Sequence, residues 1–154
     1  MIKITIRKAK TSDVRSIQNL LAHFASQGLL LPRSLSEIYD HLRDYTVIET
    51  SADNIVGVVA LNICWEDLAE VKSLAVSEDY QAKGLGKQLV KQCLAEAAVL
   101  GICRVFTLTY QQKFFENLGF KLVDKSLLPH KIWADCLKCP KFPDCDETAL
   151  LLEL

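Results

Sequence analysis

The pattern of apolar and polar positions changes several times along the chain, and each change predicts a new element. Apolar and polar residues alternate over residues 2–7, which predicts a half-buried strand. Apolar residues then recur at helical spacing over residues 14–24, which predicts a helix. Residues 11–13 offer an N-cap for this helix, and Gly28 closes it.

A second helix is predicted to begin at Ser34, because Ser34 and Glu37 have the spacing of a capping box. Three strands are then predicted over residues 46–50, 55–65 and 68–76, separated by short polar turns. Strands in such close succession favour an antiparallel meander.

The second half of the chain alternates helices with strands. We expect a helix after Gly86 that ends at Gly101, and a short helix over residues 111–118. Further strands are predicted over residues 104–109, from residue 121 to 124 and over residues 147–154. The predicted order is therefore β-α-α-β-β-β-α-β-α-β-β.

Length and composition indicate a single domain over residues 1–154. Half of the residues are apolar and 24% are charged, which is ordinary for a globular protein. The net charge of −1 gives no electrostatic case for binding nucleic acid or an anionic membrane. No apolar run approaches the roughly 20 residues of a membrane span, and the start of the chain lacks a signal-peptide core. We therefore expect a cytoplasmic protein whose six cysteines are reduced.

One turn in the chain predicts an anion site. It follows the strand over residues 68–76, contains two glycines and opens into an amphipathic helix, so that backbone N–H groups converge at the positive end of a helix dipole. A dinucleotide fingerprint is excluded, because its third glycine position is Leu89, and a P-loop is excluded because no Ser or Thr follows Lys87. The turn consists of Gln81, Ala82, Lys83, Gly84, Leu85, Gly86 and Lys87.

The strand end Leu74-Ala75-Val76 and the segment over residues 80–86 together resemble the coenzyme-A-binding motif of the GNAT acetyltransferase family. The resemblance implies an α/β (α+β) GNAT fold, in which helices flank a mixed, mostly antiparallel central sheet. It also implies acetyl-CoA as the cosubstrate. Residues 81–87 would bind its pyrophosphate, and the backbone of Leu74, Ala75 and Val76 would bind its thioester carbonyl and pantetheine arm.

Glu70 is the candidate catalytic residue. Acetyl transfer needs a neutral amine, and a carboxylate can take the amine proton directly or through a water molecule. The resemblance implies this role for a Glu on this strand. The alternative is that Glu70 is an ordinary charged residue on the protein surface, since strand alternation would put Glu70, Lys72 and Leu74 on one face.

A narrower resemblance extends over residues 3–129, to the catalytic domain of N-acetylglutamate synthase. It is based on residues 31–34, 70–76, 108–109 and 114–120. It implies that Arg33 and Lys131 bind substrate carboxylates. The chain departs from the wider family at Phe115, where many members carry a tyrosine that protonates the leaving thiolate.

A cysteine-containing tail over residues 130–147 is a second departure. Cys136 and Cys139 have the spacing of a metal knuckle, and Cys145 is a candidate third ligand for a structural metal such as zinc. A redox dithiol and a plain loop remain alternatives. Cys64, Cys93 and Cys103 lie in apolar patterns and are predicted to be core residues.

The sequence therefore predicts an enzyme, an acetyl-CoA-dependent N-acetyltransferase of a small-molecule amino acid. By resemblance the acceptor is L-glutamate and the pathway is arginine biosynthesis. The alternatives are acetylation of another small amine or of a protein N-terminus, and a non-catalytic acetyl-CoA-binding or thiol-sensing module. A homodimer is compatible with the sequence.

Overall fold

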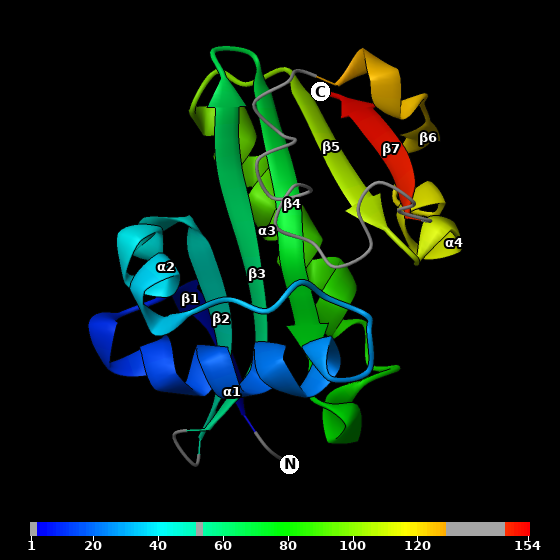
Figure 1. Ribbon diagram of the computed structural model, residues 1–154. Coiled ribbons are helices and arrows are strands. Elements are labelled where there is room, and N and C mark those ends of the chain that lie inside the picture. The colour runs from blue at the N-terminus through cyan, green and yellow to red at the C-terminus, as the bar shows by residue number, and fades with distance from the viewer. Residues whose placement is uncertain (1–2, 52–53, 129–146) are drawn as a thin grey trace.

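The computed structural model describes residues 3–51, 54–128 and 147–154. Within these residues, seven strands form one sheet in the order β1-β2-β3-β4-β5-β7-β6 (Figure 1). The strands are β1 (Ile4–Lys8), β2 (Tyr45–Thr50), β3 (Ile55–Trp65), β4 (Leu68–Val76), β5 (Arg104–Thr109), β6 (Lys121–Leu122) and β7 (Thr148–Glu153). Neighbouring strands are antiparallel except β4 and β5, which run parallel. The predicted mixed, mostly antiparallel sheet is thus confirmed.

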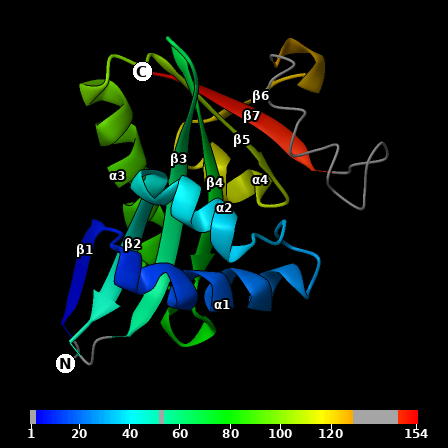
Figure 2. The same cartoon turned by 60° about the vertical axis from the view of Figure 1, so that its left-hand side comes forward.

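Helices cover both faces of the sheet (Figure 2). They are α1 (Val14–Ala25), α2 (Leu35–Asp40), α3 (Leu85–Val99) and α4 (Gln112–Glu116). One apolar core joins α1 and α2 to β2 and β3, and a second joins α3 and Phe115 of α4 to the opposite face. Across the described residues, no helix has the length and apolar character needed to cross a membrane.

The predicted element order agrees with the structure, while the start of α3 and the capping of α1 differ from the prediction. α3 begins at Leu85, so Gly84 is its N-cap and Gly86 lies inside its first turn. The capping box of α2 forms as predicted, because the backbone N–H of Glu37 donates to Ser34 Oγ at 3.1 Å. Asp13 precedes α1, but its side chain does not cap that helix.

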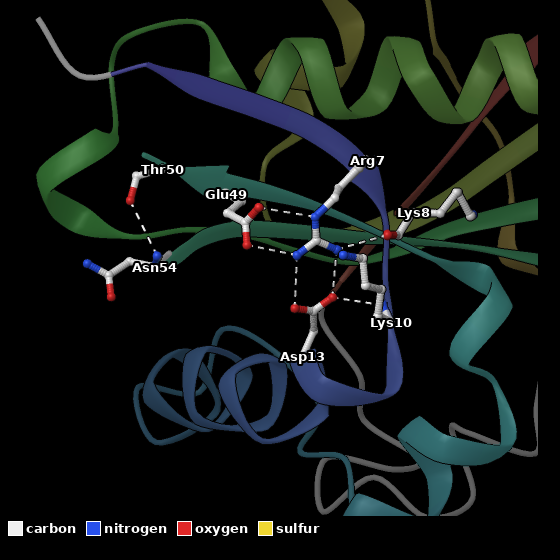
Figure 3. Close-up of polar contacts among 7 residues, drawn as sticks. All are labelled: Arg7, Lys8, Lys10, Asp13, Glu49, Thr50 and Asn54. Atoms are coloured by element: carbon white, nitrogen blue, oxygen red, sulfur yellow. Dashed lines mark hydrogen bonds and ion pairs between the residues drawn. The ribbon is translucent and has the colours of Figure 1, made fainter. Parts of the chain in front are cut away.

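Asp13 instead binds Arg7 of β1 in a cluster at the edge of the sheet (Figure 3). The Arg7 guanidinium donates to both carboxylate oxygens of Asp13, at 2.7 and 3.0 Å, and to both of Glu49, at 3.3 and 3.0 Å. Asp13 also accepts from the backbone N–H of Lys10 at 2.7 Å. Hydrogen bonding to Arg7 lowers the pKa of Asp13 and of Glu49. The cluster therefore fastens β1, β2 and the turn before α1.

We expect Arg7→Met to lower the free energy of unfolding by roughly 2 kcal/mol at neutral pH, because it leaves the nearly buried Asp13 carboxylate without its cation. The pKa of Asp13 is depressed in the folded state, so its contribution is complete above the unfolded value of about 3.9 and is lost as the pH falls through the folded value. Urea unfolding at pH 7 and pH 3 measures both effects.

Lys8→Met is the matched control for this prediction. Lys8 pairs with Glu96 at 3.1 Å, but both side chains are substantially exposed, so the substitution should change the free energy of unfolding by less than about 1 kcal/mol. The deficit of Arg7→Met should shrink at pH 3. An equal deficit at both pH values would show that packing, not the charge pair, is what the substitution removes.

Candidate active site

A cleft opens where the parallel strands β4 and β5 part. Their ladder pairs residues 68–70 with residues 104–106, and beyond it the two strands diverge (Figure 1). Thr107 Oγ1 donates to the carbonyl of Val71 at 2.9 Å, which links the strands at the apex of the opening. The resulting cleft has a volume of about 710 Å³.

The walls of the cleft come from segments that are far apart in the sequence. One wall is the end of α1 with Phe24 and Gln27, and another is the turn between β4 and α3. Across the cleft lie the end of β5 and the start of α4, including Thr109 and Phe114. His23 of α1 is hydrogen-bonded to the Glu78 carboxylate of the β4–α3 turn, so these two walls are joined.

A β-bulge in β4 shapes the floor of the cleft. Val58 and Ala60 of β3 pair with Ala75 and Lys72, so the two intervening β4 residues, Ser73 and Leu74, stand opposite one residue of β3. Ser73 has a φ of +56°, a left-handed conformation that is uncommon for a residue with a Cβ.

This bulge corrects the predicted alternation along β4. Ala69 and Val71 before the bulge and Leu74 and Val76 after it all pack into the core beneath α3. Glu70 therefore faces the opposite side of the sheet from Leu74, and not the same side as strict alternation would require. The extra residue at the bulge is the physical reason.

The backbone beyond the bulge points into the opening between the strands. The N–H of Ser77 donates to the carbonyl of Val56 in β3 at 2.7 Å, so Ser77 faces the β3 edge. The carbonyl of Val76 instead accepts from Gln81 Nε2 at 2.8 Å, so Val76 faces the other edge. Since N–H and C=O of one strand residue share an edge, the N–H of Val76 points to the side that β5 has left.

The predicted anion turn lies beside this edge. Ala82 and Gly84 have φ values of +62° and +76°. Gly84 is the N-cap of α3, and because glycine has no side chain, it cannot cap the first N–H groups of the helix. Lys83 and Lys87 are exposed next to these N–H groups. Gly86 packs inward, because an added Cβ would lie 3.4 Å from the Phe114 ring. The turn thus offers backbone donors, a helix dipole and positive charge together.

Glu70 is buried in β4 next to the apex of the cleft and is only 8% exposed. It is the last β4 residue paired with β5, and the cleft lining begins at the next residue, Val71. On its other side Glu70 stands directly opposite Asn62 of β3, so the two side chains share a face at close range. The Asn62 amide donates to the Asp44 carboxylate at 3.2 Å. A surface position for Glu70 is therefore excluded.

Arg33 lies on the face of the sheet that carries α1 and α2, with its side chain 9% exposed and 3.6 Å from the Glu37 carboxylate. Burial raises the pKa of Tyr45, and the nearby Arg33 charge acts in the opposite direction. The neighbouring Ser73 side chain also acts to lower the pKa of Tyr45. Arg33, Tyr45 and Ser73 therefore form one polar cluster at the β4 bulge.

Tyr45 was not identified from the sequence, although a signal for it exists. The residue begins a strand that is otherwise mostly apolar and buried, and a buried tyrosine normally finds a partner for its hydroxyl. Phe115 is confirmed as an apolar position: it is 3% exposed and packs edge-on against Phe114 and Phe120.

The structure describes three of the six cysteines. The predicted metal ligands Cys136, Cys139 and Cys145 lie outside the described residues, as does Lys131. Within the described ranges, no group of three or more His, Cys, Asp or Glu residues could hold a metal ion. Cys93 is a core residue, and burial raises the pKa of its thiol to about 12. Cys103 is exposed, which corrects its predicted core position, because it lies in the turn between α3 and β5.

The sequence resembles several known acetyltransferases. An N-acetyltransferase of Chlorobaculum tepidum is 36% identical over 97% of this chain and 96% of that protein. An amino-acid acetyltransferase of Mycobacterium tuberculosis is 33% identical over 77% of this chain and 69% of that protein. Amino-acid acetyltransferases of Neisseria meningitidis are 32% identical over 82% of this chain, which spans 29% of their length.

Solved structures agree with these sequence relatives. N-acetylglutamate synthase of Neisseria gonorrhoeae, complexed with coenzyme A and N-acetyl-glutamate, superposes with a TM-score of 0.88 at 27% identity. The match covers 99% of this chain and 35% of the synthase. A Mycobacterium tuberculosis protein in complex with CoA superposes with a TM-score of 0.82 at 27% identity, over 97% of this chain and 99% of that one.

The sequence pattern of the acetyltransferase (GNAT) domain matches residues 41–122, which contain the parted strands, the bulge and the glycine turn. This range is more than half of the chain. The chain therefore belongs to the GNAT family of acetyltransferases.

Proposed function

We propose that the protein transfers the acetyl group of acetyl-CoA to the α-amino group of an amino acid, and that L-glutamate is the first acceptor to test. The observation that carries this proposal is one strand, β4, whose 70–76 segment joins three features. Glu70 is buried one residue before the cleft lining begins, Ser73 forms the bulge, and Val76 aims its backbone at the space between β4 and β5. Amino-acid acetyltransferases among the relatives support the same acceptor class.

Residues 81–87 are proposed to bind the pyrophosphate of acetyl-CoA. Two phosphates carry negative charge. The glycine turn and the first turn of α3 together offer N–H groups, a helix dipole, and the two lysines Lys83 and Lys87. From there the pantetheine arm would follow the opening between β4 and β5 toward Glu70. The backbone N–H groups of Leu74 and Val76 would bind the pantetheine arm and the thioester carbonyl, where they stabilise the charge that develops on oxygen.

The reaction is proposed to be a direct attack within one ternary complex. The amine nitrogen attacks the acetyl carbon, a C–N bond forms and the C–S bond breaks. Glu70 would accept the amine proton, directly or through water, because it is buried in β4 one residue before the cleft lining begins. The thiolate of coenzyme A leaves and is protonated by solvent, since Phe115 carries no hydroxyl at the position where many relatives have a tyrosine.

Arg33 is proposed to bind a carboxylate of the acceptor. Its guanidinium is nearly buried beside Tyr45 and Ser73, and a guanidinium binds carboxylates through two parallel hydrogen bonds. Glutamate has two carboxylates, so a second cation is required. Lys131 is the proposed second group, and it lies outside the described residues.

An acceptor panel tests this function directly. Release of thiol from acetyl-CoA is followed with glutamate, aspartate, glutamine, a simple primary amine and a short peptide. We expect glutamate to give the highest kcat/KM. A preference for the peptide or the simple amine would keep the acetyltransferase assignment and reject the amino-acid substrate. No thiol release with any acceptor, alongside tight acetyl-CoA binding, would favour the non-catalytic alternative.

Arg33→Ala tests the carboxylate contact. We expect the KM for glutamate to rise about 30-fold or more, because loss of a buried charge pair costs roughly 2–5 kcal/mol, while the KM for acetyl-CoA stays nearly unchanged. Arg43→Ala is the matched control, since Arg43 is exposed in the short 3-10 helix between α2 and β2. If both Michaelis constants of Arg33→Ala rose together, Arg33 would be a structural residue.

A further inference from the structure

The segment that leads from β4 into the glycine turn has little apolar packing of its own. Residues 78–80 form a short 3-10 helix with no buried residue, and both Glu78 and Asp79 are exposed. Tyr80, at the end of the segment, packs with part of its surface against the core beneath α3. Few buried apolar contacts mean low local stability, so polar contacts must fix the start of this segment.

The C-terminal end of α1 is a well-fixed neighbour of this segment. Four side chains of α1 are buried in the core that it shares with β2 and β3. The helix ends at Gly28, which has a φ of +74°, and the N–H of Leu29 donates to the carbonyl of Phe24 at 3.1 Å. This contact closes the last turn, so the end of α1 has a defined position on the sheet.

His23 connects α1 to the segment (Figure 1). Its ring packs edge-on against Phe24, with 5.0 Å between the ring centroids, and its Nε2 is hydrogen-bonded to the Glu78 carboxylate. This hydrogen bond lowers the pKa of Glu78, so the carboxylate is ionised at neutral pH. An ionised carboxylate only accepts hydrogen bonds, so the imidazole is the donor.

We propose that His23 is a positioning residue for the cosubstrate, which holds Glu78 against α1 and thereby fixes the approach to the anion turn of residues 81–87. The inference rests on the proposed function in one respect, namely that this turn binds the pyrophosphate. Gln81 begins the turn, and its side chain donates to the carbonyl of Val76 at 2.8 Å. The segment between β4 and the turn is thus held at two points, Glu78 and Gln81.

The sign of the effect separates this role from simple electrostatics. Glu78 is a negative charge near a proposed pyrophosphate site, so electrostatics alone predicts that its removal strengthens the binding of CoA. The positioning role predicts the opposite, because the anion turn loses one of the contacts that hold it. The direction of the change in affinity therefore decides between the two.

Alanine substitutions at matched positions provide the test. His23→Ala, Glu78→Ala and the double variant remove the contact. Asp79→Ala is the control for charge, because Asp79 is the next residue of the same 3-10 helix and is exposed. Asn19→Ala is the control for α1, because Asn19 is exposed one turn before His23.

We expect His23→Ala to weaken the binding of CoA about threefold to fivefold in isothermal calorimetry. The side chains of His23 and Glu78 are 51% and 62% exposed, so the pair contributes no more than an exposed pair does. Glu78→Ala should weaken binding somewhat less, because the loss of its charge acts in the opposite direction. Acetyl-CoA and CoA should be affected equally, since the phosphates are common to both. Asn19→Ala should match the wild type, and Asp79→Ala should bind at least as tightly.

The double variant tests whether the two residues act together. It should match Glu78→Ala, because His23 then has no carboxylate to hold. Steady-state kinetics gives a second readout. The KM for acetyl-CoA should rise by the same factor as the dissociation constant, while kcat and the KM for the acceptor stay nearly unchanged.

Two results would overturn the inference. Tighter binding of CoA by Glu78→Ala, as for the charge control, would leave only the electrostatic effect. An equal loss on His23→Ala with and without Glu78 would mean that His23 acts independently of this contact.

Gly84→Val separates failure of the inference from failure of the proposed function. If Gly84→Val bound CoA normally while folded, the turn would not be the pyrophosphate site, and both would fail. If Gly84→Val lost affinity while His23→Ala and Glu78→Ala bound CoA as the wild type does, only the inference would fail.

Discussion

Glu70→Ala is expected to lower kcat by roughly 10²–10⁴ at neutral pH, the range that a positioned general base contributes. The acceptor amine is protonated in neutral solution, so the uncatalysed route must wait for its rare neutral form. We expect Glu70 to remove this limit by accepting the amine proton, because it is the last β4 residue paired with β5 and the cleft lining begins at the next residue. The substitution should leave acetyl-CoA affinity largely unchanged, since the glycine turn and the β4 backbone are untouched.

The pH–rate profile distinguishes this role from a packing role. The rate of Glu70→Ala should keep rising with pH to values at which the wild type has levelled off, because only the free amine then reacts. Glu70→Gln keeps the volume of the side chain and should lose as much activity as Glu70→Ala. Glu116→Gln, on the exposed side of α4, is the control carboxylate. Near-normal turnover in Glu70→Gln would assign Glu70 to packing.

Local patterns explain why the fold could be predicted from the sequence. Helices and strands were identified by their periods, and turns by glycine and polar residues, because these signals depend on neighbours within a few positions. The capping box of Ser34 and Glu37 is of this kind. Asp13 is a position where local pattern is not sufficient. Its place in the sequence suits a helix cap, but in the structure its carboxylate accepts hydrogen bonds from Arg7 of β1.

The candidate site was predictable only in part, because much of it depends on register. Glu70 and the glycine turn were predicted through motifs. The bulge at Ser73 arises from how β4 pairs with β3, and the position of Tyr45 opposite Ala60 also needs the register of β2. No local pattern reports the alignment of three strands, so alternation assigned Leu74 to the wrong face.

Gly84→Val is expected to weaken acetyl-CoA binding by well over tenfold. Gly84 has a φ of +76°, and a β-branched residue strongly disfavours that region. A valine would pull the turn toward negative φ and redirect the first N–H groups of α3, which are the proposed donors to the pyrophosphate. Isothermal calorimetry with acetyl-CoA and with CoA measures the loss, which should be similar for both because each carries the same phosphates.

The other end of α3 provides a matched control. Gly101 has a φ of +85°, and at both glycines an added Cβ would meet nothing within 4 Å. Gly101→Val should therefore cost a comparable amount of stability, on the order of 1–2 kcal/mol, through the same backbone strain. It should leave acetyl-CoA affinity close to that of the wild type, because Gly101 follows the C-terminal end of α3 and the cleft lies at its N-terminal end. If the two variants lost affinity equally, strain in α3 and not the anion turn would account for the effect; if Gly84→Val bound acetyl-CoA normally while folded, the pyrophosphate would have to bind elsewhere.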